Sequence, residues 1–236
     1  YASIPQDSLP YIPDIIEVQA LRITPDIELA AIDQIKEQLR SYSEDISSGR
    51  RDFSTIARLY SQDTRTSVQG GEYGFVARSS LEPEFAQVVF ALSDTKQVSP
   101  IVRTATGYHI VQLIEKRDNT INFRHILLKP SVAPEKLQLA VAKADSIAVA
   151  VRNGQETFDE AVVLHSNVIE SKNNYGLLLN EDYESDRYGT ALFTMSELRQ
   201  DYVSYVDKMQ VGDVSQAFVS QDRDGNTQVV LLKLKQ

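Results

Sequence analysis

The sequence repeats itself at a constant offset, and this repeat limits the folds that the chain can adopt. Six pairs of identical residues are separated by 105 positions: Ile16 and Ile121, Pro25 and Pro130, Gly49 and Gly154, Phe53 and Phe158, Ser61 and Ser166, Gly71 and Gly176. Self-similarity at a fixed spacing is typical of a structural unit that occurs more than once. The sequence therefore predicts two tandem domains, residues 14–117 and 119–236, joined by polar residues 117–120. A proline-containing segment, 1–13, is expected to form an extended linker before them.

Each copy combines strand-like and helix-like patterns. Residues 16–23 alternate as in a half-buried strand, and an apolar stripe over 27–46 predicts a long helix that Gly49 ends. A shorter helix is expected over 53–60 with Asp52 as its N-cap. A glycine turn, a strand, a short helix and a closing strand follow. In the second copy the polar stretch 180–188 lengthens a turn, and 229–232 closes the domain. This order predicts an α+β fold, in which each domain is a small antiparallel sheet with helices on one face.

Composition excludes several classes of function. The formal net charge of −9 argues against nucleic-acid binding, which requires a basic surface. No apolar run is long enough to predict membrane insertion. The chain has no cysteine, and its three histidines are scattered without an HExxH pattern, so no metal site is predicted. Residues 222–226 contain an Asp-Gly pair and are expected to form a hairpin turn rather than a calcium loop.

Residues 60–114 of the first copy hold the candidate functional side chains. Leu81, Phe85 and Phe90 have the spacing of core packing, and also that of a small apolar cleft. His109 follows a tyrosine on a predicted strand and is compatible with a hydrogen-bonded core histidine. Asp63 is compatible with a turn or a helix end. The residues alone leave both readings open.

The order of motifs in this stretch resembles that of one enzyme family. Ser-x-Asp at 61–63, Gly-Gly-x-x-Gly-Phe at 70–75, Leu-x-Pro-x-Phe at 81–85 and Gly-Tyr-His-Ile at 107–110 resemble the parvulin-type peptidyl-prolyl cis/trans isomerases. The resemblance implies two tandem parvulin (FKBP-like) domains and no cofactor. It further implies that Asp63, Thr104 and His109 are catalytic, and that Leu81, Phe85, Phe90 and Tyr108 bind the substrate.

Both copies depart from the family pattern, in which two histidines face each other across the sheet. The first copy keeps His109 but has Ala20 in its opening strand. The second copy has His125 in its opening strand, while Gln228 stands at the expected closing position and Val168 replaces Asp63. These departures predict weak activity in the first domain and none in the second, where His125 is expected to be a structural counterpart.

Two such modules behind an N-terminal segment resemble periplasmic chaperones of Gram-negative bacteria. The resemblance implies a periplasmic isomerase and chaperone whose clients are unfolded or proline-containing polypeptides, outer-membrane proteins among them. A chain that begins at Tyr1 without methionine is compatible with a processed product. The alternative is a non-catalytic chaperone or scaffold module that only binds peptides or partner proteins.

Overall fold

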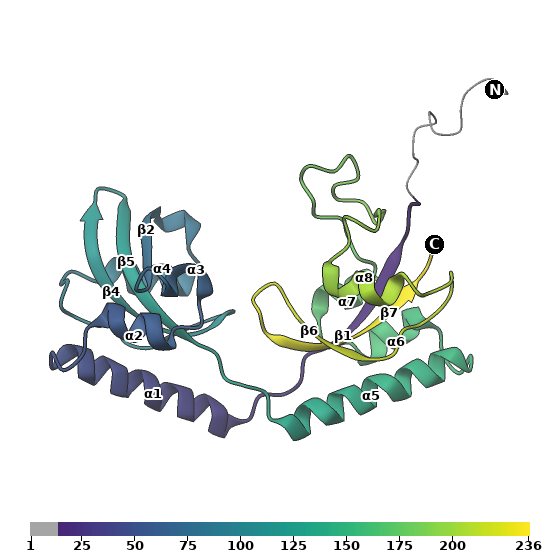
Figure 1. Ribbon diagram of the computed structural model, residues 1–236, viewed down its shortest axis with the longest axis horizontal. Helices are drawn as coiled ribbons and strands as arrows, with labels where there is room; N and C mark the ends of the chain where they lie inside the picture. Colours follow the sequence, from purple (N-terminus) through teal and green to yellow (C-terminus); the bar gives the residue numbers. More distant parts are fainter. Residues whose placement is uncertain (1–13) are drawn as a thin grey trace. The chain divides into compact units, whose positions relative to one another are not determined.

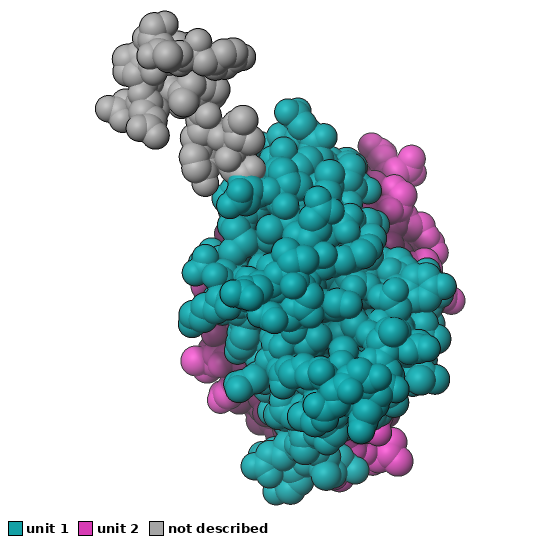
Figure 2. Space-filling view, turned by 90° about the vertical axis from the view of Figure 1, so that its right-hand side faces the viewer, with its two compact units in different colours: residues 1–25, 134–221, 227–236 teal, residues 26–133, 222–226 magenta. Residues whose placement is uncertain are grey.

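The computed structural model describes residues 14–236, which form two compact units (Figure 1). Among the described residues, unit 1 comprises 14–25, 134–221 and 227–236, and unit 2 comprises 26–133 and 222–226 (Figure 2). The predicted linker 1–13 lies outside the described residues. No helix of the described part is long and apolar enough to cross a membrane.

Unit 2 is a four-stranded antiparallel sheet with helices on both faces. Its elements are α1 (Leu29–Ser47), α2 (Phe53–Tyr60), α3 (Thr64–Ser67), β2 (Glu72–Ala77), a 3-10 turn (Arg78–Ser80), α4 (Pro83–Ala91), β3 (Val102–Thr104), β4 (Gly107–Arg117) and β5 (Thr120–Leu128). The strands are ordered β2-β5-β4-β3.

Two apolar clusters pack against this sheet, one on each face. Leu39 and Tyr42 of α1 pack with Phe53 and Ile56 of α2 on one face, whereas Phe85 of α4 packs on the other. The expectation that all helices cover one face was therefore wrong. The long strands β4 and β5 carry apolar side chains on both sides, so both faces need a cover.

Unit 1 repeats the arrangement with fewer strands. It contains β1 (Val18–Ile23), α5 (Pro134–Arg152), α6 (Phe158–His165), α7 (Ile169–Asn173), α8 (Gln200–Val206), β6 (Phe218–Gln221) and β7 (Thr227–Leu234). Its strands are ordered β1-β7-β6. Helices α5 and α6 cover one face of this sheet and α8 covers the other.

The two repeats exchange their opening strands. Strand β1, the first in the sequence, pairs with β7 of the second repeat, from Val18 opposite Leu234 to Ile23 opposite Val229. Strand β5, which opens the second repeat, lies between β2 and β4 of the first. The contiguous boundaries 14–117 and 119–236 therefore do not match the compact units.

A tight turn explains this difference. Residues 117–120 were expected to link two domains, but Arg117 pairs with Thr120 and only Asp118 and Asn119 separate β4 from β5. Asp118 has a φ of +45°, as two-residue hairpin turns require. Such a short connection holds β5 beside β4, so the opening strand of the second repeat becomes part of unit 2.

Most local expectations are confirmed. The stripe over 27–46 forms α1, and Gly49 follows the end of that helix with a φ of +72°. Asp52 occupies the N-cap position of α2, although its carboxylate accepts hydrogen bonds from the hydroxyls of Ser54 and Thr55 rather than from a backbone N–H. Residues 222–226 connect β6 to β7 as a turn.

Candidate active site

The exchange of strands brings two histidines together in unit 2. His109 on β4 and His125 on β5 point to the same face of the sheet, and their Nδ1 atoms are 3.2 Å apart. The imidazole rings are nearly parallel, with 10° between their planes. Both side chains are almost fully buried. The facing pair, which the first repeat lacks when taken alone, is therefore complete once β5 joins the sheet.

Asp63 anchors one end of this pair. It is the N-cap of α3, and its carboxylate accepts hydrogen bonds from the backbone N–H and the guanidinium of Arg65. The other carboxylate oxygen lies 3.0 Å from Nε2 of His125. The hydrogen bond from His125 is the largest cause that holds the pKa of Asp63 well below its usual range. Asp63 is therefore an ionised, buried group that orients His125.

Two threonines occupy the other end of the pair. Nε2 of His109 is 2.9 Å from the hydroxyl of Thr104 and 3.2 Å from that of Thr106. The hydroxyl of Thr66 also lies 3.0 Å from Nε2 of His125. A continuous chain of polar atoms thus runs from Thr104 through both imidazoles to the carboxylate of Asp63.

One arrangement of protons satisfies this chain with both imidazoles neutral. Nε2–H of His125 donates to Asp63, Nδ1–H of His109 donates to His125, and the hydroxyl of Thr104 donates to His109. Burial is the largest cause that lowers the pKa of His109 to about 3. His109 is therefore uncharged near neutral pH and can accept from the threonine. Among the described residues, no group of three or more His, Cys, Asp or Glu side chains is arranged to hold a metal ion.

Apolar side chains cover the histidine pair. The ring of Phe85 on α4 stands edge-on to His109, with 5.0 Å between ring centroids, and it also contacts His125. Phe85 is 6% exposed, while Leu81 and Phe90 remain half-buried at the border of the same cluster. The guanidinium of Arg78 lies over the ring of Phe90. The predicted wall residues thus share one face of the sheet with the histidines.

Gly71 allows His125 to take this position. Its φ is +82°, and a Cβ there would lie 2.3 Å from the carbonyl oxygen of His125. The carbonyl of Gly71 accepts a hydrogen bond of 2.9 Å from the backbone N–H of His125. Only a residue without a side chain allows so close an approach of two backbones.

Comparison with known families identifies this arrangement. The family model described as Rotamase, the PPIC-type PPIASE domain, matches residues 21–115 and 125–226. The chain belongs to this family. It contains two parvulin-type domains, as the motif order predicted.

Two relatives are similar over part of the chain. It is 41% identical over 85 residues to the Chaperone SurA of Shewanella sp. (strain MR-4) and 42% identical over 85 residues to the Chaperone SurA of Burkholderia thailandensis. These matches cover 36% of this chain but only 19% and 18% of the two relatives. The chain thus aligns with about a fifth of the curated relatives it matches. A crystal structure of the peptidylprolyl isomerase PrsA from Bacillus cereus shares 27% identity over 44% of this chain and 36% of that one, with a TM-score of 0.31.

Two site expectations need correction within the parvulin fold, and two residues of the site were missed. Tyr108 was expected to bind substrate, but it is buried with α1 on the opposite face from His109, because adjacent strand residues point to opposite sides. His125 was assigned to the second domain as a structural counterpart, yet it lies beside His109 in unit 2. Thr66 and Thr106 were not singled out, although both bond to the histidine pair. Thr106 carried a signal in the sequence, since it lies two residues after Thr104.

The parvulin domain of unit 1 lacks the polar chain. Ala20 pairs with Leu232 as His125 pairs with Val111, and Arg22 pairs with Val230 as Leu127 pairs with His109. The counterpart of His109 is therefore Val230, and the assignment of Gln228 to that position was wrong by two residues. Ala20, Val230 and Leu232 are fully buried in an apolar cluster together with Tyr202. Among the described residues of unit 1, nothing replaces the histidine pair.

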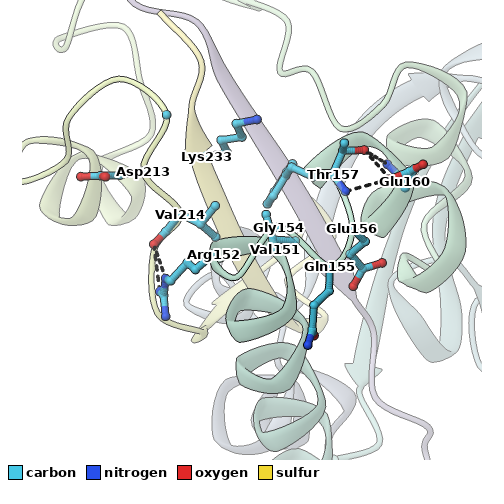
Figure 3. A pocket seen from close by; sticks show the side chains of 12 residues that line it. Val151, Arg152, Gly154, Gln155, Glu156, Thr157, Glu160, Asp213, Val214 and Lys233 are labelled. Atoms are coloured by element: carbon cyan, nitrogen blue, oxygen red, sulfur yellow. Dashed lines mark hydrogen bonds between the residues drawn. The ribbon is translucent and has the colours of Figure 1, made fainter.

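Unit 1 contains a cavity of another kind. Its volume is about 560 Å³, and it is lined by residues of α5, the start of α6 and the segment before β6 (Figure 3). Arg152 donates to the carbonyl oxygens of Val214 and Ser215, and Glu160 closes the N-terminus of α6 in a capping box with Thr157. Arg152, Thr157 and Glu160 at its wall are thus already hydrogen-bonded, and none of the predicted site residues lines the cavity.

Proposed function

We propose that this chain is a peptidyl-prolyl cis/trans isomerase and chaperone, with its active site in unit 2. The observation that carries the proposal is the unbroken chain from Thr104 through His109 and His125 to Asp63, next to Phe85. Asp63 and His109 are buried and have strongly lowered pKa values, a combination that is typical of functional sites.

The reaction requires no bond cleavage. Rotation about an X–Pro amide must cross a barrier of about 18–20 kcal/mol, while the two isomers differ by about 1 kcal/mol or less. The planar amide is more polar than the twisted one, so a site that excludes water favours the twisted state. Leu81, Phe85 and Phe90 would receive the pyrrolidine ring, and the polar chain beneath them would hold its protons in one fixed order.

Asp63 acts in this proposal as a positioning residue. Its carboxylate is only 6% exposed and bonds to His125 and Arg65. In this proposal Asp63 therefore orients the pair of imidazoles, whereas the family resemblance implied that it is itself catalytic.

Exchange NMR on an Ala-Pro peptide tests the catalytic proposal with the whole chain. We expect the wild type to raise the cis/trans exchange rate, and Phe85→Ala and His109→Gln to lower it. Tyr60→Phe, a substitution outside the polar chain, is the matched control. An exchange rate that stays at the uncatalysed value with the wild type would refute the isomerase.

The chaperone part of the proposal is supported by the loss of the polar chain from unit 1. A domain that keeps the fold without His109, His125 or Asp63 is suited to binding without turnover. We propose unfolded or proline-containing polypeptides as clients, outer-membrane proteins among them, and the periplasm as the location. Suppression of aggregation of an unfolded outer-membrane protein by both the wild type and Phe85→Ala is expected. If the wild type suppresses nothing, the chaperone role is refuted whatever the isomerase assay gives. Fractionation of the source cells tests the location.

A further inference from the structure

An insertion distinguishes unit 1 from unit 2. Gly71 precedes Leu81 by 10 positions, whereas the corresponding Gly176 precedes Leu198 by 22 positions (81 − 71 and 198 − 176). Leu81 and Leu198 correspond because each stands four residues before a buried aromatic ring, Phe85 or Tyr202. The additional residues lie in the loop 179–192, between Leu178 and Phe193, which both belong to the apolar cluster that contains Ala20 and Val230. This loop therefore borders the part of unit 1 that corresponds to the active site.

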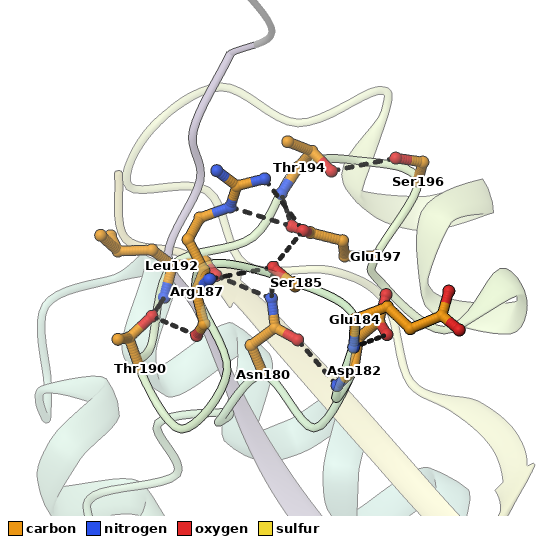
Figure 4. Close-up of polar contacts among 10 residues, drawn as sticks. All are labelled: Asn180, Asp182, Glu184, Ser185, Arg187, Thr190, Leu192, Thr194, Ser196 and Glu197. Carbon is orange, nitrogen blue, oxygen red and sulfur yellow. Dashed lines mark hydrogen bonds and ion pairs between the residues drawn. The ribbon is translucent and has the colours of Figure 1, made fainter.

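The loop is held by a dense polar network (Figure 4). Glu197 accepts a bidentate ion pair from Arg187, a hydrogen bond from the hydroxyl of Ser185 and one from the backbone N–H of Thr194. The ion pair with Arg187 is the largest cause that lowers the pKa of Glu197 to about 2. The side chain of Asn180, which is 1% exposed, accepts from the N–H of Asp182 and donates to the carbonyl of Leu192. These contacts fix the loop before any ligand arrives.

Two tyrosines at the tip of this loop are stacked and exposed. The rings of Tyr183 and Tyr188 lie 4.5 Å apart between centroids, with 27° between their planes. Tyr183 is 84% exposed and Tyr188 is 48% exposed. An aromatic pair held open to solvent by a rigid loop loses little conformational entropy on binding.

The charges around the pair indicate what it binds. Residues 181–188 contain four carboxylate side chains and a single basic residue, Arg187, which Glu197 already engages. Asp182, Glu184 and Asp186 are exposed beside the tyrosines. A tyrosine face attracts a guanidinium or ammonium group, and adjacent carboxylates pair with the same cation.

We propose that Tyr183 and Tyr188 form a binding surface for arginine- or lysine-bearing segments of unfolded polypeptides. The proposal rests on the client-binding part of the function proposed above and names the client class that unit 1 takes. It does not depend on the isomerase site, because none of the polar chain of unit 2 contributes to it.

The test uses the full chain and two synthetic peptides. One is a Gly-Ser peptide that carries several arginines, and the other has glutamine in place of each arginine. We expect the arginine peptide to bind at least about fivefold more tightly than the glutamine peptide. Its amide shift changes should centre on residues 181–189. Binding should weaken as the salt concentration rises, since exposed charges are screened within about 8 Å at 0.15 M salt.

Variants separate the surface from the rest of the protein. The double substitution Tyr183→Ala and Tyr188→Ala should reduce the affinity for the arginine peptide to that for the glutamine peptide, and leave the exchange rate of an Ala-Pro peptide unchanged. Tyr60→Ala is a matched control, because Tyr60 is also exposed and stacked but already has Arg51 over its ring. Tyr183→Phe with Tyr188→Phe should retain the affinity.

Three results would overturn the proposal: equal binding of the two peptides by the wild type, unchanged affinity in the double alanine variant, or shift changes elsewhere in the chain. The comparison of the two peptides needs only the wild type, so it tests the proposal even if the double alanine variant does not fold. Loss of isomerase activity with intact peptide discrimination would instead refute only the catalytic part of the proposed function.

Discussion

Nδ1 of His109 lies 3.2 Å from Nδ1 of His125, although the two residues belong to different repeats of the sequence. The first copy contributes His109 on β4, and the opening strand of the second copy contributes His125 on β5. The other unit receives β1, with Ala20 at the corresponding position opposite Leu232. The residue that each opening strand carries therefore suits the sheet it joins: a histidine for the polar chain, and an alanine for the apolar cluster.

Loss of the His125 ring is expected to disable the site of the first repeat. His125→Gln removes the bridge between His109 and Asp63, so kcat/KM for an Ala-Pro peptide should fall about tenfold or more, where each tenfold corresponds to about 1.4 kcal/mol of transition-state stabilisation. The matched control is His165→Gln, because His165 is the other histidine of the second repeat and lies outside the polar chain. Equal activity of the two variants would contradict the role assigned to His125.

Fragments test the exchange of strands directly. Residues 14–117 lack β5, which is the partner of both β2 and β4, so this fragment should remain unfolded. Residues 26–133 contain the complete four-stranded sheet and should fold with the polar chain intact. Amide shift dispersion in NMR spectra distinguishes the two. A well-dispersed spectrum from 14–117 would mean that the opening strands are not exchanged.

Removal of the Asp63 carboxylate is expected to cost more stability than the loss of an ordinary helix cap. Asp63→Ala removes the charged acceptor of His125 and leaves only the hydroxyl of Thr66 near that nitrogen, so we expect the free energy of unfolding to fall by about 2–3 kcal/mol. Thr157→Ala removes the N-cap side chain of α6, at a cost of about 1 kcal/mol. Chemical denaturation measures both. Equal losses would mean that Asp63 serves as a cap and no more.

Alanine substitutions at two glycines distinguish the cost of backbone strain from the cost of a steric clash. Gly71 and Gly74 have similar φ values, +82° and +85°, but a Cβ at Gly74 would meet nothing within 4 Å. Gly74→Ala should therefore cost only about 1–2 kcal/mol of strain. Gly71→Ala adds a conflict with the carbonyl of His125 and should cost at least about 2 kcal/mol more. It should also lower the isomerase activity, which Gly74→Ala should not do; equal effects would contradict the close approach.

Acid should destabilise the protein through His109. Burial lowers the pKa of this imidazole to about 3 in the folded chain, from an ordinary value near 6.5 in the unfolded chain. Between these values the unfolded chain binds the extra proton, so the free energy of unfolding falls as the pH falls through this window, by up to about 1.4 kcal/mol per pH unit. His109→Gln should flatten this dependence between pH 6.5 and about 4. An identical slope in the variant would show that His109 does not remain neutral.

Several features of the fold could be predicted from local patterns. The apolar stripe over 27–46 predicted α1, and the constant offset predicted two copies of one domain. The family resemblance placed Thr104 and His109 in one site, and in the structure their side chains are hydrogen-bonded to each other. The sequence could also have excluded Tyr108 from the site, because adjacent residues of a strand point to opposite faces of the sheet and His109 is the next residue.

Other features depend on which strands meet. Both opening strands alternate in the same way, so their patterns alone do not say which sheet each one joins. The register of β7 is a second example. Sequence spacing assigned Gln228 to the closing histidine position, while the pairing of Arg22 with Val230 moves that position by two residues. Because loop lengths differ between the repeats, sequence spacing alone does not identify the residue that corresponds to His109, and the strand pairing is needed.

The sequence by itself determined the repeat, the family and most of the groups that form the polar chain. Only the tertiary structure decided that His125 faces His109. The hydrogen bonds of a strand ladder come from the backbone, which is the same in β1 and β5, so side-chain patterns do not select the partner. The two-residue turn at Asp118 and Asn119 and the burial of His125 against Asp63 select it instead.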